Sequence, residues 1–152
     1  MNVPSPFYLV YQLKIDRIME VSELRIGNLV KIKTSNDAAF YPVYAIDGVG
    51  LKVVLGGCRQ SEGWKEEKLL KPIPITEELL LKCGFEYQMQ EHCFDKSRLR
   101  LRLYESRGCS VYIGFAIAFR WQWNDANMEL KHLHQLQNLF YSLTGKELEV
   151  TV

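Results

Sequence analysis

Residues 98–123 read RLRLRLYESRGCSVYIGFAIAFRWQW, and they decide what kind of fold this chain can form. Apolar and polar side chains alternate on both sides of a turn predicted at residues 105–108. Because successive side chains of a strand point to opposite faces, the alternation predicts long antiparallel strands with one buried face. It assigns these residues to the buried face: Val111, Ile113, Phe115, Ile117, Phe119, Trp121 and Trp123.

The same segment leaves two placements open for its tryptophans. If the alternation continues without interruption, Trp121 and Trp123 belong to the core, which is the interpretation we favour. If the strand ends at Phe119, they form an exposed aromatic platform for a base or a proline-rich peptide. Gly114 marks a bulge or a break into two strands, because glycine weakens a strand interior.

Two helices are predicted to flank these strands. The first begins after Thr76, a good N-cap residue, and ends at Gly84, the residue type preferred just beyond a helix. The second is longer, from Met128 to Thr144, and is closed by Gly145. Its apolar residues recur on one face, which indicates a helix packed along a core: Leu130, Leu133, Leu136, Phe140 and Leu143.

Three short apolar segments precede the helices, at residues 29–33, 43–46 and 51–55, with turn residues between them. This spacing predicts a small antiparallel β-barrel of the SH3-like kind. The expected fold class is therefore α+β. In it, the barrel is joined to an antiparallel sheet, which the short helix and the long C-terminal helix cover.

The chain divides into three parts on this basis. Residues 1–18, with Pro4 and Pro6, differ from the rest and are expected to form an N-terminal extension. A barrel-like unit follows at 19–70 and an α+β unit at 71–152, although 19–152 could equally form one continuous domain.

Composition restricts the classes of function. The formal net charge of the 152 residues is +1, which argues against a strongly basic nucleic-acid domain. Four widely spaced cysteines without a C-x-x-C motif predict reduced thiols, neither a disulfide scaffold nor a zinc site. No segment approaches the ~20 apolar residues of a membrane span, and no signal peptide is recognisable. We therefore expect no membrane partner and a cytoplasmic location.

Motifs of catalytic and cofactor sites are missing from the sequence, which has no H-E-x-x-H, P-loop, G-x-G-x-x-G or G-x-S-x-G. His132 and His134 stand two positions apart. On a helix they would diverge by about 200° and could not hold one metal ion. The sequence predicts no catalytic residue, metal or cofactor, and it favours a non-enzymatic function without deciding the question.

The first candidate site is the arginine row, which consists of Arg98, Arg100 and Arg102. A strand spaces these side chains about 6.5–7 Å apart on one face, close to the phosphate repeat of an extended nucleic-acid strand. Arginine binds phosphate through paired hydrogen bonds, and Tyr112 and Arg120 on the partner strand would extend the surface. The alternative is a solvated face on which the arginines pair with Asp or Glu, and the near-neutral charge favours it.

The second candidate site is the helix strip, a polar edge of the last helix formed by His134, Gln137, Asn138 and Tyr141. His134 could act as a general base, while the other three could hydrogen-bond a small molecule. The alternative is a polar seam whose hydrogen bonds hold the helix against the sheet. Because no carboxylate or nucleophile is spaced to complete a triad, we favour the seam.

Three blocks of the chain resemble a family of small uncharacterised proteins from Bacteroides-type gut bacteria, their prophages and other mobile elements. The blocks are SELRIGNLV at 22–30, PIPITEELL at 72–80 with Gly84-Phe85, and HLHQLQNLFYSLTGKEL at 132–148. The resemblance implies a phage or mobile-element setting and carries no assigned activity.

The favoured expectation is a non-enzymatic phage or mobile-element accessory protein that binds a host or phage partner protein. The alternative is a binder of nucleic acid or of a phosphorylated nucleotide-type ligand, held by the arginine row with Tyr112 and Arg120. A third possibility, an enzyme using His134 and Tyr141, requires a cleft beside a histidine whose pKa lies near neutrality. The sequence leaves the oligomeric state open.

Overall fold

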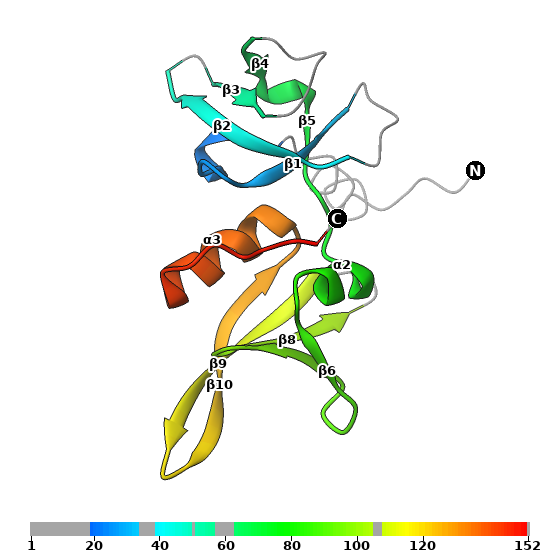
Figure 1. The fold of residues 1–152 in the computed structure, drawn as a ribbon, viewed down its shortest axis with the longest axis vertical. Helices are drawn as coiled ribbons and strands as arrows, with labels where there is room; N and C mark the ends of the chain where they lie inside the picture. Colours follow the sequence, from blue (N-terminus) through cyan, green and yellow to red (C-terminus); the bar gives the residue numbers. More distant parts are fainter. Residues whose placement is uncertain (1–18, 34–38, 50, 57–62, 105–107, 152) are drawn as a thin grey trace, which may run out of the picture.

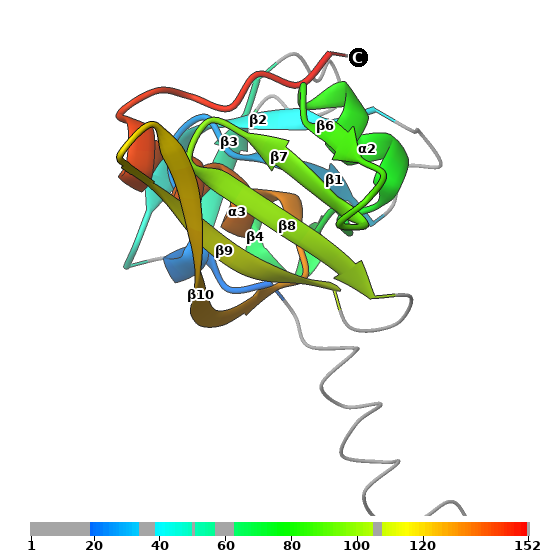
Figure 2. The same ribbon diagram turned by 90° about the horizontal axis from the view of Figure 1, so that it is seen from below.

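The computed structural model describes residues 19–33, 39–49, 51–56, 63–104 and 108–151. These residues form two five-stranded antiparallel sheets with the helix α3 (Leu133–Thr144) between them (Figure 1). A view turned by 90° shows the same layers, with the second sheet in front of α3 and the first behind it (Figure 2). The predicted extension at 1–18 lies outside the described residues.

The first sheet has the strand order β4-β3-β2-β1-β5. Its elements in chain order are η1 (Val21–Glu23), β1 (Leu29–Ile32), β2 (Tyr41–Asp47), β3 (Lys52–Leu55), β4 (Lys65–Glu66), η2 (Glu67–Leu69) and β5 (Leu70–Lys71), where η denotes a 3-10 helix. Apolar side chains on one face form a compact cluster, in which Val30, Val43 and Leu70 are at most 1% exposed. This cluster is the smaller of two cores.

The predicted SH3-like barrel is wrong, because the first sheet does not close. Among the described strands, β4 pairs with β3 and β5 pairs with β1, but the two edge strands do not pair with each other. Each is two residues long and η2 connects them directly, so neither has enough backbone groups left for a closing ladder.

The second sheet is a meander in the order β10-β9-β8-β7-β6. Its elements and the two α-helices are α2 (Glu77–Lys82), β6 (Glu86–Gln88), β7 (Cys93–Lys96), β8 (Leu99–Tyr104), β9 (Gly108–Ile117), β10 (Arg120–Leu130) and α3. One face packs on both helices and forms the larger core, which includes Leu80, Leu101, Leu133 and Leu136. We call this the inner face of the second sheet and the opposite side its outer face.

The short helix α2 has the ends that the sequence predicts. The hydroxyl of Thr76 accepts a hydrogen bond from the Leu79 amide at the N-terminus. Gly84 follows the helix at φ +80°, and the Phe85 amide bonds to the Leu80 carbonyl as the chain turns back.

The prediction of a long C-terminal helix is wrong for the first turns of that helix. Residues 128–130 belong to β10, where Glu129 pairs with Ser110 and Leu130 with Cys109. The strand therefore uses backbone groups that the predicted helix would need, and α3 starts at Leu133.

The chain is mostly β rather than α+β, since α3 is the only described helix of seven or more residues. Neither helix in the described part of the chain is long and apolar enough to cross a membrane.

The β9–β10 hairpin differs most from the sequence expectation. Ala118 and Phe119 form a two-residue turn at φ +48° and +67°, and Arg120 pairs back with Ile117. This register places Trp121 opposite Ala116 and Trp123 opposite Gly114, so both tryptophans face away from the inner side. The predicted continuous buried face is wrong beyond Ile113, because the following residues lie on a hairpin that projects from the body (Figure 1).

Candidate functional site

Arg100 and Arg102 lie on the outer face of the second sheet, as strand alternation requires, whereas Arg98 precedes β8 and reaches Phe115, on the face of the hairpin opposite the tryptophans. Each guanidinium lies over an aromatic ring of β9 or β10, measured from the Cζ atom to the ring centroid: Arg98 over Phe115 at 5.5 Å, Arg100 over Trp123 at 4.4 Å and Arg102 over Tyr112 at 5.7 Å. Tyr112 therefore joins the row, as the sequence suggests. Arg120 does not, because it alternates with Trp121 and lies on the other face of the hairpin.

Hydrogen bonds within the chain already engage the arginine row. Nε and Nη2 of Arg100 each donate to a different carboxylate oxygen of Asp95, both at 2.7 Å. This pair is largely shielded from solvent, and the hydrogen bond to Asp95 raises the pKa of Arg100. Arg98 donates to the Gly114 carbonyl and Arg102 to the Glu91 carbonyl, each at 3.3 Å. The guanidinium groups of the row thus mainly have partners within the chain. Arg98 and Arg102, at the two ends of the row, are exposed, whereas Arg100 is not.

The two tryptophans form the tryptophan platform, defined here as the stacked indoles of Trp121 and Trp123. Their ring centroids are 6.0 Å apart and their planes differ by 23°. Gly114 lies beneath them, and a Cβ atom at this position would lie 2.9 Å from Trp123 and 3.1 Å from Trp121. The missing side chain of Gly114 therefore allows both rings to lie flat on the strand.

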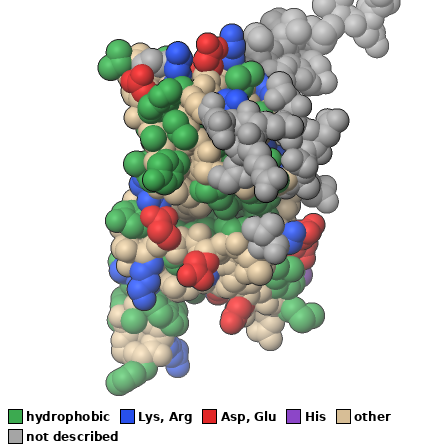
Figure 3. All heavy atoms as spheres, turned by 45° about the horizontal axis from the view of Figure 1, so that its top comes forward, with side chains coloured by type: hydrophobic (Ala, Val, Ile, Leu, Met, Phe, Trp, Pro, Cys, Tyr) green, Lys and Arg blue, Asp and Glu red, His purple; other side chains and the backbone are tan. Residues whose placement is uncertain are grey.

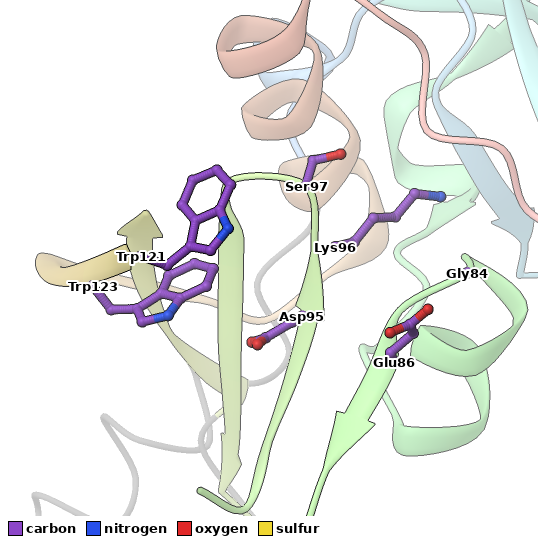
Figure 4. Close-up of a pocket in the computed structure, with 7 residues that line it drawn as sticks. All are labelled: Gly84, Glu86, Asp95, Lys96, Ser97, Trp121 and Trp123. Carbon is purple, nitrogen blue, oxygen red and sulfur yellow. The ribbon is translucent and has the colours of Figure 1, made fainter. Parts of the chain in front are cut away.

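A cavity of about 320 Å³ opens beside the tryptophan platform (Figure 4). The indoles form one wall, while Gly84 and Glu86, at the start of β6, form the opposite one. Asp95, Lys96 and Ser97, from the end of β7 and the turn after it, line the space between the walls. The Lys96 side chain runs away from the indoles (Figure 4), and its ammonium donates to the Cys83 carbonyl.

The hairpin also carries the most exposed group of large apolar side chains. Phe119 at its tip is fully exposed, and Phe115, Ile117 and Trp121 are 41%, 53% and 54% exposed. A space-filling view shows apolar side chains at the end of the molecule that this hairpin forms (Figure 3). A surface of this kind, with arginines beside it, is suited to contact another macromolecule.

The helix strip lies where α3 meets the first sheet, a junction that we call the seam. The Gln137 side chain accepts from the Leu29 amide at 2.9 Å and donates to the Gly27 carbonyl at 3.4 Å. Asn138 accepts from the Asn28 side chain and donates to the Glu23 carbonyl. These amide groups are therefore engaged inside the chain.

Tyr141 occupies the outer end of the same seam. The Arg25 guanidinium lies 4.3 Å from its ring centroid and also donates to Glu147 at 2.9 Å. The hydrogen bond to Glu147 raises the pKa of Arg25, so the guanidinium is held as a charged partner over the ring. The four residues of the helix strip are thus brought together, but as contacts between α3 and residues 23–29.

His134 is the buried member of the seam. Its ring is 1% exposed, its Nε2 lies 3.4 Å from a Glu23 carboxylate oxygen, and its Nδ1 has no hydrogen-bond partner among the described residues. Burial lowers the pKa of His134 and also that of His132. The two rings stack with centroids 5.7 Å apart, contrary to the predicted divergence, because His132 is extended at the N-cap of α3.

No group of three or more potential metal ligands occurs among the residues that the structure describes. Three of the cysteines, Cys83, Cys93 and Cys109, are buried free thiols, whereas Cys58 lies outside the described residues. Burial raises the pKa of Cys83 to about 11 and that of Cys109 to about 12. These two thiols are therefore protonated at neutral pH and are poor nucleophiles.

Sequence reasoning missed Glu86 and Asp95, and it favoured the wrong placement for Trp121 and Trp123. The tryptophans carried a signal, since two indoles two positions apart on a strand share one face. The carboxylates carried none, because only the pairing of β6, β7 and β8 brings them near the indoles. Comparison with protein-family models, with curated proteins and with solved structures finds no match to this chain.

Proposed function

We propose that this protein is a non-catalytic, cytoplasmic binding module that holds a host or phage protein against its β9–β10 hairpin. One observation carries the proposal: a projecting hairpin displays Phe115, Ile117, Phe119 and Trp121, each at least 41% exposed. Aromatic side chains dominate the energetic centres of protein interfaces, where burial of their large rings contributes most to affinity.

The conformation of the hairpin tip supports the same proposal. Phe119 adopts φ +67°, a region that glycine or asparagine occupies with less strain than a phenylalanine. A bulky apolar residue at an exposed, left-handed turn position is unfavourable for folding and for solubility. A role in contact with a partner explains why the ring is there.

The other candidate sites support binding over catalysis. Gln137 and Asn138, which the sequence offered for hydrogen-bonding a small molecule, are hydrogen-bonded across the seam. The phage or mobile-element setting is part of the proposal and rests on the family resemblance of the three sequence blocks. A partner from the host or from the phage itself is consistent with that setting.

A protein partner is favoured over nucleic acid because Asp95 neutralises the central arginine of the row. The favoured experiment is retention of host-lysate proteins on the immobilised full chain, compared with two exposed-site variants. Phe119→Gly removes the tip ring, and Tyr44→Gly removes a 74% exposed ring from β2 of the first sheet as the matched control.

We expect a defined protein to be retained by the wild type and by Tyr44→Gly but not by Phe119→Gly. That protein, once purified, should form a stoichiometric complex with the wild type on size-exclusion chromatography. Identical retention by all three chains contradicts the proposal. Retention of nucleic acid that is salt-sensitive and lost in Arg102→Glu would assign binding to the arginine row instead.

A further inference from the structure

We propose that the cavity beside the tryptophan platform is a subsite for one basic side chain, a lysine or an arginine, presented by the bound partner. The inference rests on the proposed function and names the chemistry that the partner must supply. Its evidence is independent of the hairpin tip, because it comes from the indoles, the carboxylates and the size of the cavity.

The tryptophan platform presents a π surface to the cavity. Trp121 is 54% exposed, so much of its ring is free for contact, while Trp123 is held between Arg100 and Trp121. Indole is the aromatic ring that attracts cations most strongly, since the electron density of its face is negative. The existing contact of Arg100 with Trp123, at 4.4 Å, shows that this platform already accepts a guanidinium.

Glu86 supplies a carboxylate on the opposite wall. It is exposed at the start of β6 and, in the described part of the chain, has no side-chain hydrogen bond or ion pair. A cation on the indole of Trp121 would be attracted by the negative face of the ring and by this carboxylate across the cavity. Asp95 adds a second carboxylate at the base, although two of its acceptor positions are used by Arg100.

The chain's own cations near the cavity already have partners within the chain. Lys96 donates to the Cys83 carbonyl and its ammonium lies 5.5 Å from the Phe140 ring centroid, toward the inner face. Arg100 is paired with Asp95. Glu86 therefore stands opposite the platform without a basic partner from these two residues, and the cavity favours a cation over an anion.

The size of the cavity is sufficient for a single side chain. A volume of about 320 Å³ lies at the lower end of the range for small-molecule sites. The unbranched stem of lysine or arginine can lie over the indole of Trp121 while its charged end enters the cavity, whose opposite wall carries Glu86. A larger ligand would extend beyond the walls.

The test follows the indole N–H signals of the full chain by NMR during titration with N-acetyl-lysine amide and N-acetyl-arginine amide. Trp64 is 52% exposed and does not line the cavity, so its signal is an internal control. We expect saturable shifts for Trp121 and Trp123 but not for Trp64. The uncharged N-acetyl-norleucine amide should produce much smaller shifts.

Two variants locate the charge contact. Glu86→Gln removes the carboxylate and should weaken binding of the basic probes about three- to fivefold, as expected for a partly exposed ion pair. Trp121→Ala should weaken it about tenfold or more. Glu91→Gln, an exposed carboxylate outside the cavity, is the matched control and should leave the affinity unchanged.

Three outcomes overturn the inference: equal shifts with norleucine amide, which indicate an apolar shelf; shifts with inorganic phosphate alone, which indicate an anion site; and no shifts with any probe. The proposed function fails separately, when Phe119→Gly retains the same lysate protein as the wild type. Loss of that protein in Phe119→Gly, together with inert basic probes, leaves partner binding in place without this subsite.

Discussion

The seam beneath α3 and the β9–β10 hairpin distribute polar and apolar side chains in opposite ways. In the seam, polar side chains are inside: Gln137 is 3% exposed and His134 is 1% exposed. In the hairpin, apolar side chains are outside, with Phe119 fully exposed and Trp121 at 54%. Each region thus reverses the usual relation between polarity and burial.

The two regions differ in whether the folded chain itself provides partners for these side chains. The amides of Gln137 and Asn138 have hydrogen-bond partners between residues 23 and 29, so the folded chain by itself compensates their burial. The apolar side chains of the hairpin tip remain open to solvent in the folded chain. Apart from Nδ1 of His134, the polar side chains of the seam therefore have partners within the described chain, whereas the hairpin gains most when something covers it.

The largest effect is expected from breaking the seam with Gln137→Leu. The leucine conserves volume but removes the acceptor for the Leu29 amide and the donor to the Gly27 carbonyl. We expect the free energy of unfolding to fall by about 2 kcal/mol, because two partly buried backbone groups lose their partner. Urea denaturation followed by circular dichroism measures this, and a change below about 0.5 kcal/mol would show that the seam does not hold α3.

The second effect is expected at the floor of the tryptophan platform. Gly114→Val places a side chain where even a Cβ atom would lie 2.9 Å from Trp123, so the indoles must move apart. We expect a loss of about 1–2 kcal/mol from overpacking, together with loss of the exciton signal of the stacked indoles in circular dichroism. Ser110→Val, on the same face of β9, is the control, and an unchanged exciton signal in Gly114→Val would refute the assigned geometry.

The two regions also show how far the sequence could lead. The cap at Thr76 and the closure of the last helix at Gly145 were predictable, because both depend on chemistry within one turn of the chain. The start of α3 was not, because residues 128–130 pair with β9 across the sheet. Local pattern cannot distinguish a helix turn from a strand whose partner is distant in sequence.

The candidate site was harder to predict than the fold. A two-residue turn at Ala118 and Phe119 reverses which face the later residues occupy, yet neither residue is the glycine or asparagine that usually marks such a turn. The alternation therefore looked continuous and assigned Trp121 and Trp123 to the core. One undetected turn was enough to move them to the surface.

A third prediction concerns the effect of acid on the seam. Burial lowers the pKa values of His134 and His132 below their ordinary value of 6.5, although Glu23 opposes the shift for both. Below about pH 6.5 the unfolded chain therefore binds more protons than the folded chain, and stability falls until the folded-state pKa is passed.

We expect the wild type to lose more stability than His134→Gln when the pH falls from neutrality through this range. Urea denaturation at a series of pH values measures the difference in stability between the two proteins. The contributions of the carboxylates that both chains share cancel in this difference. Parallel pH profiles for the two proteins would show that the pKa of His134 is the same in the folded and the unfolded chain, which contradicts the lowered pKa.

The smallest effect on stability, and the sharpest comparison with the seam, is expected at the hairpin tip. Phe119→Gly removes a ring that is fully exposed and places glycine at φ +67°, where it is less strained than phenylalanine. We expect stability to stay equal or to rise by about 0.5–1 kcal/mol, because relief of strain offsets the greater freedom of glycine in the unfolded chain. Thermal unfolding measures the change, with Tyr44→Gly as the control for loss of an exposed ring.

A variant that folds at least as well as the wild type but no longer holds its partner separates binding from folding, whereas a loss above about 1 kcal/mol would make Phe119 a structural residue like those of the seam.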